Sequence, residues 1–184
     1  MLRRILIPFL CLLGLFCTLQ AQDAPALKIA TLHPILGDMA RAIGGSHVQV
    51  ADLLRPNGNL HSFEPAPQDI AAAGQARLVL ASGKNLEPYL PKLKDALGGR
   101  AQILDLGASI PDVPVAADTA DHDHGHDGDC CAHGPNDPHW WHTPANMKRA
   151  ARALAAALTR MDPAHEQDYK AGLARWNRKM DQLS

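Results

Sequence analysis

The chain has 184 residues, a formal net charge of -1 and 46% hydrophobic residues. This composition is typical of a globular protein rather than a disordered one. The nearly balanced charge gives no reason to expect a nucleic-acid partner.

The first residues have the pattern of an export signal. Arg3 and Arg4 precede an apolar run, and Ala21 is a small residue suited to cleavage, so we expect a signal peptide over residues 1–21. The alternative is a membrane anchor, but the apolar run is short for a span, which needs about 20 residues. Removal of 21 of the 184 residues leaves 163, enough for one ordinary domain or one lobe. The two cysteines of that remainder, Cys130 and Cys131, are neighbours, so they form a strained disulfide at best and no structural framework.

Strand-like and helix-like segments then alternate along the chain. The predicted strands cover residues 27–32, 47–54, 76–82 and 101–107. The predicted helices between them cover residues 35–45, 65–75 and 85–99. This alternation predicts an α/β fold, with a parallel four-stranded sheet flanked by helices in a lobe of residues 22–118.

Residues 108–137 interrupt the alternation. They are rich in Pro, Gly, Asp and His and have no apolar period, so we expect a long exposed loop whose His/Asp-rich part is residues 119–136. Structure resumes at residues 137–161, where Thr143 and Pro144 are typical of a helix start.

The last segment, residues 162–184, predicts a further helix that begins near Asp162-Pro163. It carries an apolar stripe at helical spacing, made of Tyr169, Leu173, Trp176, Met180 and Leu183. Because the chain stops with this stripe still running, we expect the rest of the protein to be absent and the stripe to be left uncovered, which would promote self-association.

Three histidines stand just beyond predicted strands: His33, His61 and His139. In a parallel sheet the carboxyl ends of the strands share one edge, where ligands bind, so these side chains should converge in space. Neutral imidazole is the commonest protein ligand for zinc. Each histidine alone could equally be an ordinary surface or turn residue.

Two of these histidines lie in longer motifs. "GNLHSFEPAPQDI" and "NDPHWWHTP" resemble the two histidine motifs of the zinc/manganese (cluster A-I) periplasmic solute-binding proteins of metal ABC transporters. The residues that match the first motif are His61, Phe63, Glu64, Pro65 and Pro67. The residues that match the second are Asp137, Pro138, His139, Trp141 and Pro144. The resemblance implies that His61 and His139 are metal ligands.

The resemblance runs from about Lys28 to the chain end and includes "GKNLEPYLPKL". It implies the N-terminal lobe of a two-lobed receptor, followed in residues 162–184 by the start of the helix that links the lobes. Two departures stand out. Asn59-Leu60 replaces the usual Asp-Pro before His61, and the C-terminal lobe, which supplies the family's remaining ligands, is missing.

The His/Asp-rich tract resembles the insertion found in zinc-specific members. We expect it to be an auxiliary, flexible zinc-binding segment, with inert solvated sequence as the alternative. The auxiliary candidates there are His122, His124, His126 and His133. His33 and His142 are weaker auxiliary candidates near the core site.

The resemblance implies a periplasmic receptor that captures Zn(II), delivers it to an inner-membrane ABC permease and is not an enzyme. Imidazole ligands favour zinc over Mn(II), which prefers oxygen donors. One alternative is a periplasmic zinc buffer or adhesin-like metal-binding protein, which a neighbouring permease gene would argue against. A zinc-dependent hydrolase is less favoured, because the chain has no His-Glu-x-x-His and no Gly-x-Ser-x-Gly.

Overall fold

The computed structural model describes residues 25–55, 58–114 and 136–183. Its centre is a sheet of four parallel strands in the order β2-β1-β3-β4. The strands are β1 (Leu27–Thr31), β2 (Val48–Asp52), β3 (Leu78–Ala81) and β4 (Gln102–Asp105). The predicted four-stranded parallel sheet is therefore confirmed.

Five α-helices flank the sheet in the described part of the chain. They are α1 (Pro34–Gly44), α2 (Pro67–Gln75), α3 (Leu90–Leu97), α4 (Pro144–Met161) and α5 (Glu166–Asp181). Short 3-10 turns stand between them: η1 (Gly45–His47), η2 (Gly107–Ser109), η4 (Trp140–His142) and η5 (Pro163–His165). Proline occupies one of the first two positions of four of the five helices, where its missing N–H breaks no helical hydrogen bond.

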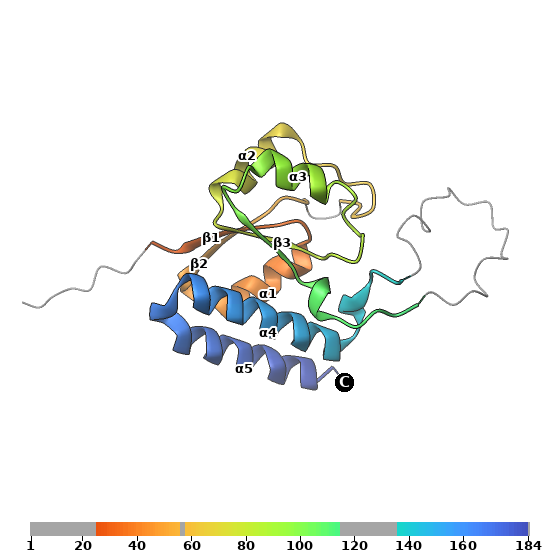
Figure 1. The fold of residues 1–184 in the computed structure, drawn as a ribbon. Coiled ribbons are helices and arrows are strands. Elements are labelled where there is room, and N and C mark those ends of the chain that lie inside the picture. Colours follow the sequence, from red (N-terminus) through yellow and green to blue (C-terminus); the bar gives the residue numbers. More distant parts are fainter. Residues whose placement is uncertain (1–24, 56–57, 115–135, 184) are drawn as a thin grey trace, which may run out of the picture.

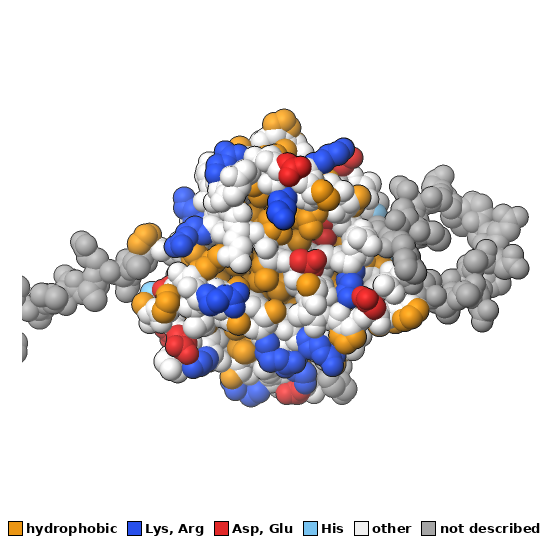
Figure 2. All heavy atoms as spheres, in the orientation of Figure 1, with side chains coloured by type: hydrophobic (Ala, Val, Ile, Leu, Met, Phe, Trp, Pro, Cys, Tyr) orange, Lys and Arg blue, Asp and Glu red, His pale blue; other side chains and the backbone are white. Residues whose placement is uncertain are grey.

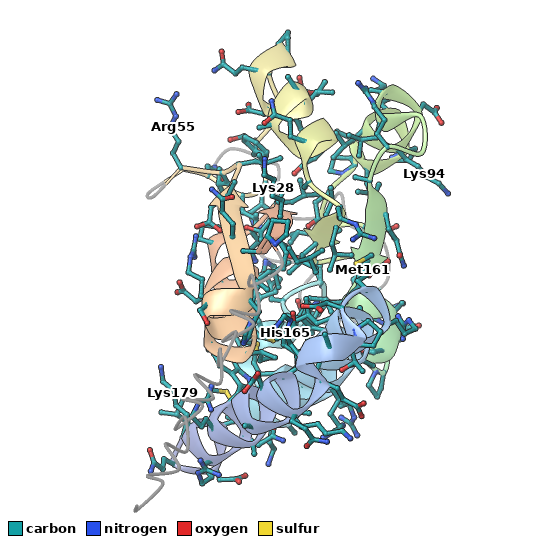
Figure 3. All side chains as sticks on the ribbon, turned by 90° about the vertical axis from the view of Figure 1, so that its left-hand side faces the viewer. Lys28, Arg55, Lys94, Met161, His165 and Lys179 are labelled. Carbon is teal, nitrogen blue, oxygen red and sulfur yellow. The ribbon has the colours of Figure 1, made fainter. Side chains whose placement is uncertain are left out.

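The helices form two layers, with α2 and α3 on one face of the sheet and α1, α4 and α5 on the other (Figures 1 and 3). The central strand β3 is buried along its whole length because both of its faces are covered. Leu78 and Leu80 belong to the core under α1, α4 and α5, whereas Val79 and Ala81 belong to the core under α2 and α3.

The apolar stripe of the last helix is buried within the chain, which corrects the expectation that it would be left uncovered. Tyr169, Trp176 and Met180 are at most 7% exposed, because α5 packs against both α1 and α4. Of the five stripe residues, only Leu183 is largely exposed, at 66%. The stripe therefore does not require a second lobe as its cover.

The outer surface of the α4–α5 pair is basic rather than apolar. Lys and Arg side chains gather along the lower part of Figure 2, over the two helices. The exposed arginines there include Arg149, Arg152, Arg175 and Arg178. Apart from Leu183, the apolar stripe is therefore not exposed for the self-association that we expected through it.

The long connection between β4 and α4 is described only at its ends. Pro114 and Asn136 form an isolated antiparallel bridge, and the Asp137 N–H donates to the Val113 carbonyl oxygen at 2.8 Å. The two ends of the connection therefore lie side by side. None of the helices in the described ranges is long and apolar enough to cross a membrane.

Candidate metal site

His61 and His139 meet at the carboxyl edge of the sheet. His61 lies in the segment between β2 and α2, and His139 directly precedes η4. Their Nε2 atoms are 3.3 Å apart, and their ring centroids are 5.3 Å apart at a tilt of 60°. Residues separated by 78 positions are thus brought together, as the parallel topology predicted.

This separation has a simple geometric meaning. Zinc binds imidazole nitrogen at about 2.0–2.1 Å in tetrahedral sites, which places two nitrogen ligands of one ion about 3.3–3.4 Å apart. The observed 3.3 Å between the two Nε2 atoms matches that edge of the tetrahedron. The distance between the two Nε2 atoms is therefore compatible with both nitrogens binding one zinc ion.

Asp137 holds the other side of the His139 ring. Its Oδ1 accepts the His139 backbone N–H at 2.9 Å and lies 2.7 Å from Nδ1. A carboxylate at this distance places the imidazole proton on Nδ1, which leaves the Nε2 lone pair free for a metal. The His139 backbone N–H also lowers the pKa of the Asp137 carboxyl, so Asp137 remains ionised as this arrangement requires.

Asn59 gives His61 the same backbone geometry. Its Oδ1 accepts the His61 N–H at 2.9 Å, the distance at which Asp137 accepts the His139 N–H. The first departure from the family motif therefore keeps the local turn, since Asn and Asp side chains both hydrogen-bond backbone two residues on. It changes the charge at this turn, because an amide stands where the resembling motif has a carboxylate.

His33 lies at the same edge, between β1 and α1, but faces other partners. Its Nδ1 is 3.3 Å from Ser82 Oγ, and its ring makes an edge contact with Trp141 at a centroid distance of 4.6 Å. Burial, reinforced by His139 and His142, lowers the pKa of His33 to about 4. His33 is therefore neutral near pH 7 and adjoins the pair.

The sequence motifs did not single out the two residues that anchor this edge. Ser82 follows β3 and is fully buried, and its carbonyl oxygen accepts the Trp140 Nε1–H at 2.9 Å. The Glu87 carboxylate accepts the backbone N–H groups of Ser82 at 2.7 Å and Gly83 at 3.0 Å. Burial raises the pKa of Glu87. The only sequence signal for Glu87 was its place in "GKNLEPYLPKL".

The other predicted auxiliary histidines are either farther from His139 or outside the described residues. The His142 ring is 6.2 Å from that of His139, measured between centroids, and its side chain is exposed. His122, His124, His126 and His133 lie outside the described residues. Within the described ranges, no group of three or more His, Cys, Asp or Glu side chains is arranged to hold a metal ion. We call the pair of His61 and His139 the half-site.

Known proteins share this arrangement of elements. A family model described as "Zinc-uptake complex component A periplasmic" (ZnuA) matches residues 29–184. A crystal structure of ZnuA superposes with a TM-score of 0.71 at 29% identity, over 86% of this chain and 56% of that one.

The names of two curated relatives refer to metals other than zinc. The iron-binding protein YfeA of Yersinia pestis is 29% identical over 167 residues, which are 89% of this chain and 48% of YfeA. The manganese ABC transporter substrate-binding lipoprotein PsaA of Streptococcus pneumoniae is 27% identical over 171 residues, 90% of this chain and 52% of PsaA. The chain thus spans about half the length of these relatives. It belongs to the zinc-uptake component A family, whose members are substrate-binding proteins of metal ABC transporters rather than enzymes.

Proposed function

We propose that this chain captures Zn(II) through His61 and His139 and delivers it to an inner-membrane ABC permease. The observation that carries the proposal is the pair of Nε2 atoms 3.3 Å apart, with Asp137 behind one ring. Capture and release need no bond to be made or broken in a substrate, so the proposal assigns the chain no catalytic residue.

The nitrogen ligands support zinc as the metal. Imidazole is well suited to zinc, whereas carboxylate and carbonyl oxygens suit manganese. The names of the relatives include iron and manganese, so the family as a whole does not decide the metal. The two imidazoles of this half-site favour Zn(II), and Mn(II) should bind more weakly.

A closed zinc site needs about four ligands, and the half-site supplies two. We propose that a C-terminal lobe, present in a protein of the relatives' length, supplies the others across a cleft. Export by residues 1–21 would place the receptor in the periplasm, where the permease is reached. His33, His142 and the tract histidines His122, His124, His126 and His133 are auxiliary in this proposal.

Calorimetric zinc titration of the purified protein tests the proposal. Loss of a residue that only hydrogen-bonds a metal ligand typically weakens metal binding by about 10- to 100-fold. His61→Ala and His139→Ala each remove a proposed ligand itself, so each should weaken zinc binding by more than that. His47→Ala is the matched control, because His47 precedes β2 at the opposite edge of the sheet and pairs with Asp168. Wild-type affinity in either site variant would contradict the proposal.

A further inference from the structure

We propose that Trp140 is a positioning residue, which fixes His139 opposite His61 through its indole N–H. This inference rests on the proposed function and names how the same site is held. Trp140 directly follows His139 and is 5% exposed, and its Nε1–H donates to the Ser82 carbonyl oxygen at 2.9 Å. A buried hydrogen bond therefore lies one residue from the ligand.

His139 needs such an anchor because its own side chain is 34% exposed. Asp137 orients the ring, but the Asp137 side chain is itself 49% exposed and lies on the same short segment. Burial therefore holds neither side chain in place, and the bond at the start of this segment is the one from the Asp137 N–H to the Val113 carbonyl oxygen. Trp140 is the neighbour that ties this segment to the buried sheet.

The acceptor is itself fixed. Ser82 is fully buried at the end of β3, and its N–H donates to Glu87 Oε1 at 2.7 Å. Glu87 is 4% exposed and also accepts the Gly83 N–H at 3.0 Å, so one buried carboxylate holds the start of this turn. The Ser82 carbonyl therefore presents an acceptor whose position is set by the core.

The structure also keeps space around that acceptor. A Cβ added to Gly107 would lie 2.4 Å from the Ser82 carbonyl oxygen, closer than real Cβ contacts allow. Glycine at this position therefore lets the 106–110 segment pass beside the oxygen without displacing it. The same turn holds that segment, since Lys84 Nζ donates to the Ile110 carbonyl oxygen at 2.7 Å. Both flanks of the long connection are thus tied to the residues that follow β3.

The chain offers a matched control for the indole N–H. Trp176 is 7% exposed, close to the 5% of Trp140, and its Nε1 has no acceptor among the described residues. Trp→Phe removes the same atoms at both positions. It removes a hydrogen bond only at position 140, and Trp176 lies on α5 away from the histidine pair.

The experiment compares Trp140→Phe with Trp176→Phe in the purified protein. Zinc affinity is measured by calorimetry, and unfolding of the metal-free protein by urea. Proton NMR of the Co(II)-loaded protein then shows the exchangeable N–H signals of coordinated imidazoles. Trp140→Phe should weaken zinc binding by about 10- to 100-fold, as for other outer-shell partners, and should broaden or remove the His139 signal. Trp176→Phe should keep both the affinity and the signals.

Wild-type affinity in Trp140→Phe, or equal weakening in both variants, would overturn the inference. If Trp140→Phe does not fold, benzothienylalanine at position 140 keeps the bicyclic ring and removes only the N–H. Failure of the proposed function looks different, since the wild-type protein would then bind no zinc or would bind it independently of His61 and His139.

Discussion

The two histidines of the half-site differ in the side chain that accepts the backbone N–H of each one. Asp137 and Asn59 accept the same backbone bond, but only Asp137 carries a charge. A carboxylate behind a ligating imidazole fixes its tautomer and raises its basicity. The Asp137 carboxylate should therefore strengthen His139 as a ligand.

Asp137→Asn tests this difference at a single residue. The amide oxygen can still accept the His139 N–H, so the turn should persist, while the loss of charge should weaken zinc binding by about tenfold. Calorimetric titration measures the change. Asn59→Asp is the mirror variant and should tighten binding. An unchanged affinity in Asp137→Asn would mean that the carboxylate does not act through His139.

His33 makes the stability of the metal-free protein depend on pH. Its pKa falls from 6.5 to about 4 on folding, so between these values the unfolded chain binds a proton that the folded chain does not. The neutral, partly buried His33 therefore imposes no loss of stability above pH 6.5, and the free energy of unfolding falls as the pH drops from 6.5 toward 4. His33→Asn should therefore lose less stability than wild type across that window, measured by urea unfolding with EDTA. Parallel pH profiles would contradict this assignment.

At the scale of elements, the sequence periods identified the strands and helices because each packs apolar residues against at least one of the two cores. Both the β3 run and the α5 stripe were recognised in this way. A period shows that a face is buried, but it does not name the partner. For that reason the stripe was assigned to a missing lobe, although α1 and α4 cover it. The Ser82–Trp140 bond was equally beyond prediction, because it joins residues 58 positions apart with no motif in common.

The contact of α5 with α1 depends on Gly172. A Cβ there would lie 2.1 Å from the Ile43 carbonyl oxygen, so Gly172→Ala must push the helices apart and should cost about 1–3 kcal/mol of unfolding free energy. Gly74→Ala is the control in α2, where the nearest atom, in the Arg100 guanidinium, is 3.6 Å away. That change should stabilise by up to about 1 kcal/mol. Urea unfolding that ranks the two variants equally would contradict the close approach.

The His/Asp-rich tract should be separable from the folded lobe. Its flanks are already joined by the Pro114–Asn136 bridge and the Asp137–Val113 backbone bond, so a shorter connection can close. Deletion of residues 121–134 should lower zinc stoichiometry and change stability by less than about 1 kcal/mol. Calorimetry and thermal unfolding measure the two effects. A large loss of stability would show that the tract is part of the fold.

For the whole molecule, alternating strands and helices were enough to predict the parallel sheet and the edge where histidines would gather. Topology cannot supply distances, so the 3.3 Å approach of the two Nε2 atoms required the structure. The half-site has two imidazoles on one lobe. The chain belongs to a family in which the relatives named above are about twice as long as this chain. Zinc held by both histidines at once is the central claim about this molecule.

Zinc K-edge X-ray absorption of the protein lacking residues 121–134 tests that claim most directly, because it counts imidazoles on the bound metal without signal from the tract. The spectrum should show two imidazole ligands with Zn–N distances of about 2.0–2.1 Å. His61→Ala and His139→Ala should each reduce the count to one. An imidazole count that either substitution leaves unchanged would contradict shared coordination by His61 and His139.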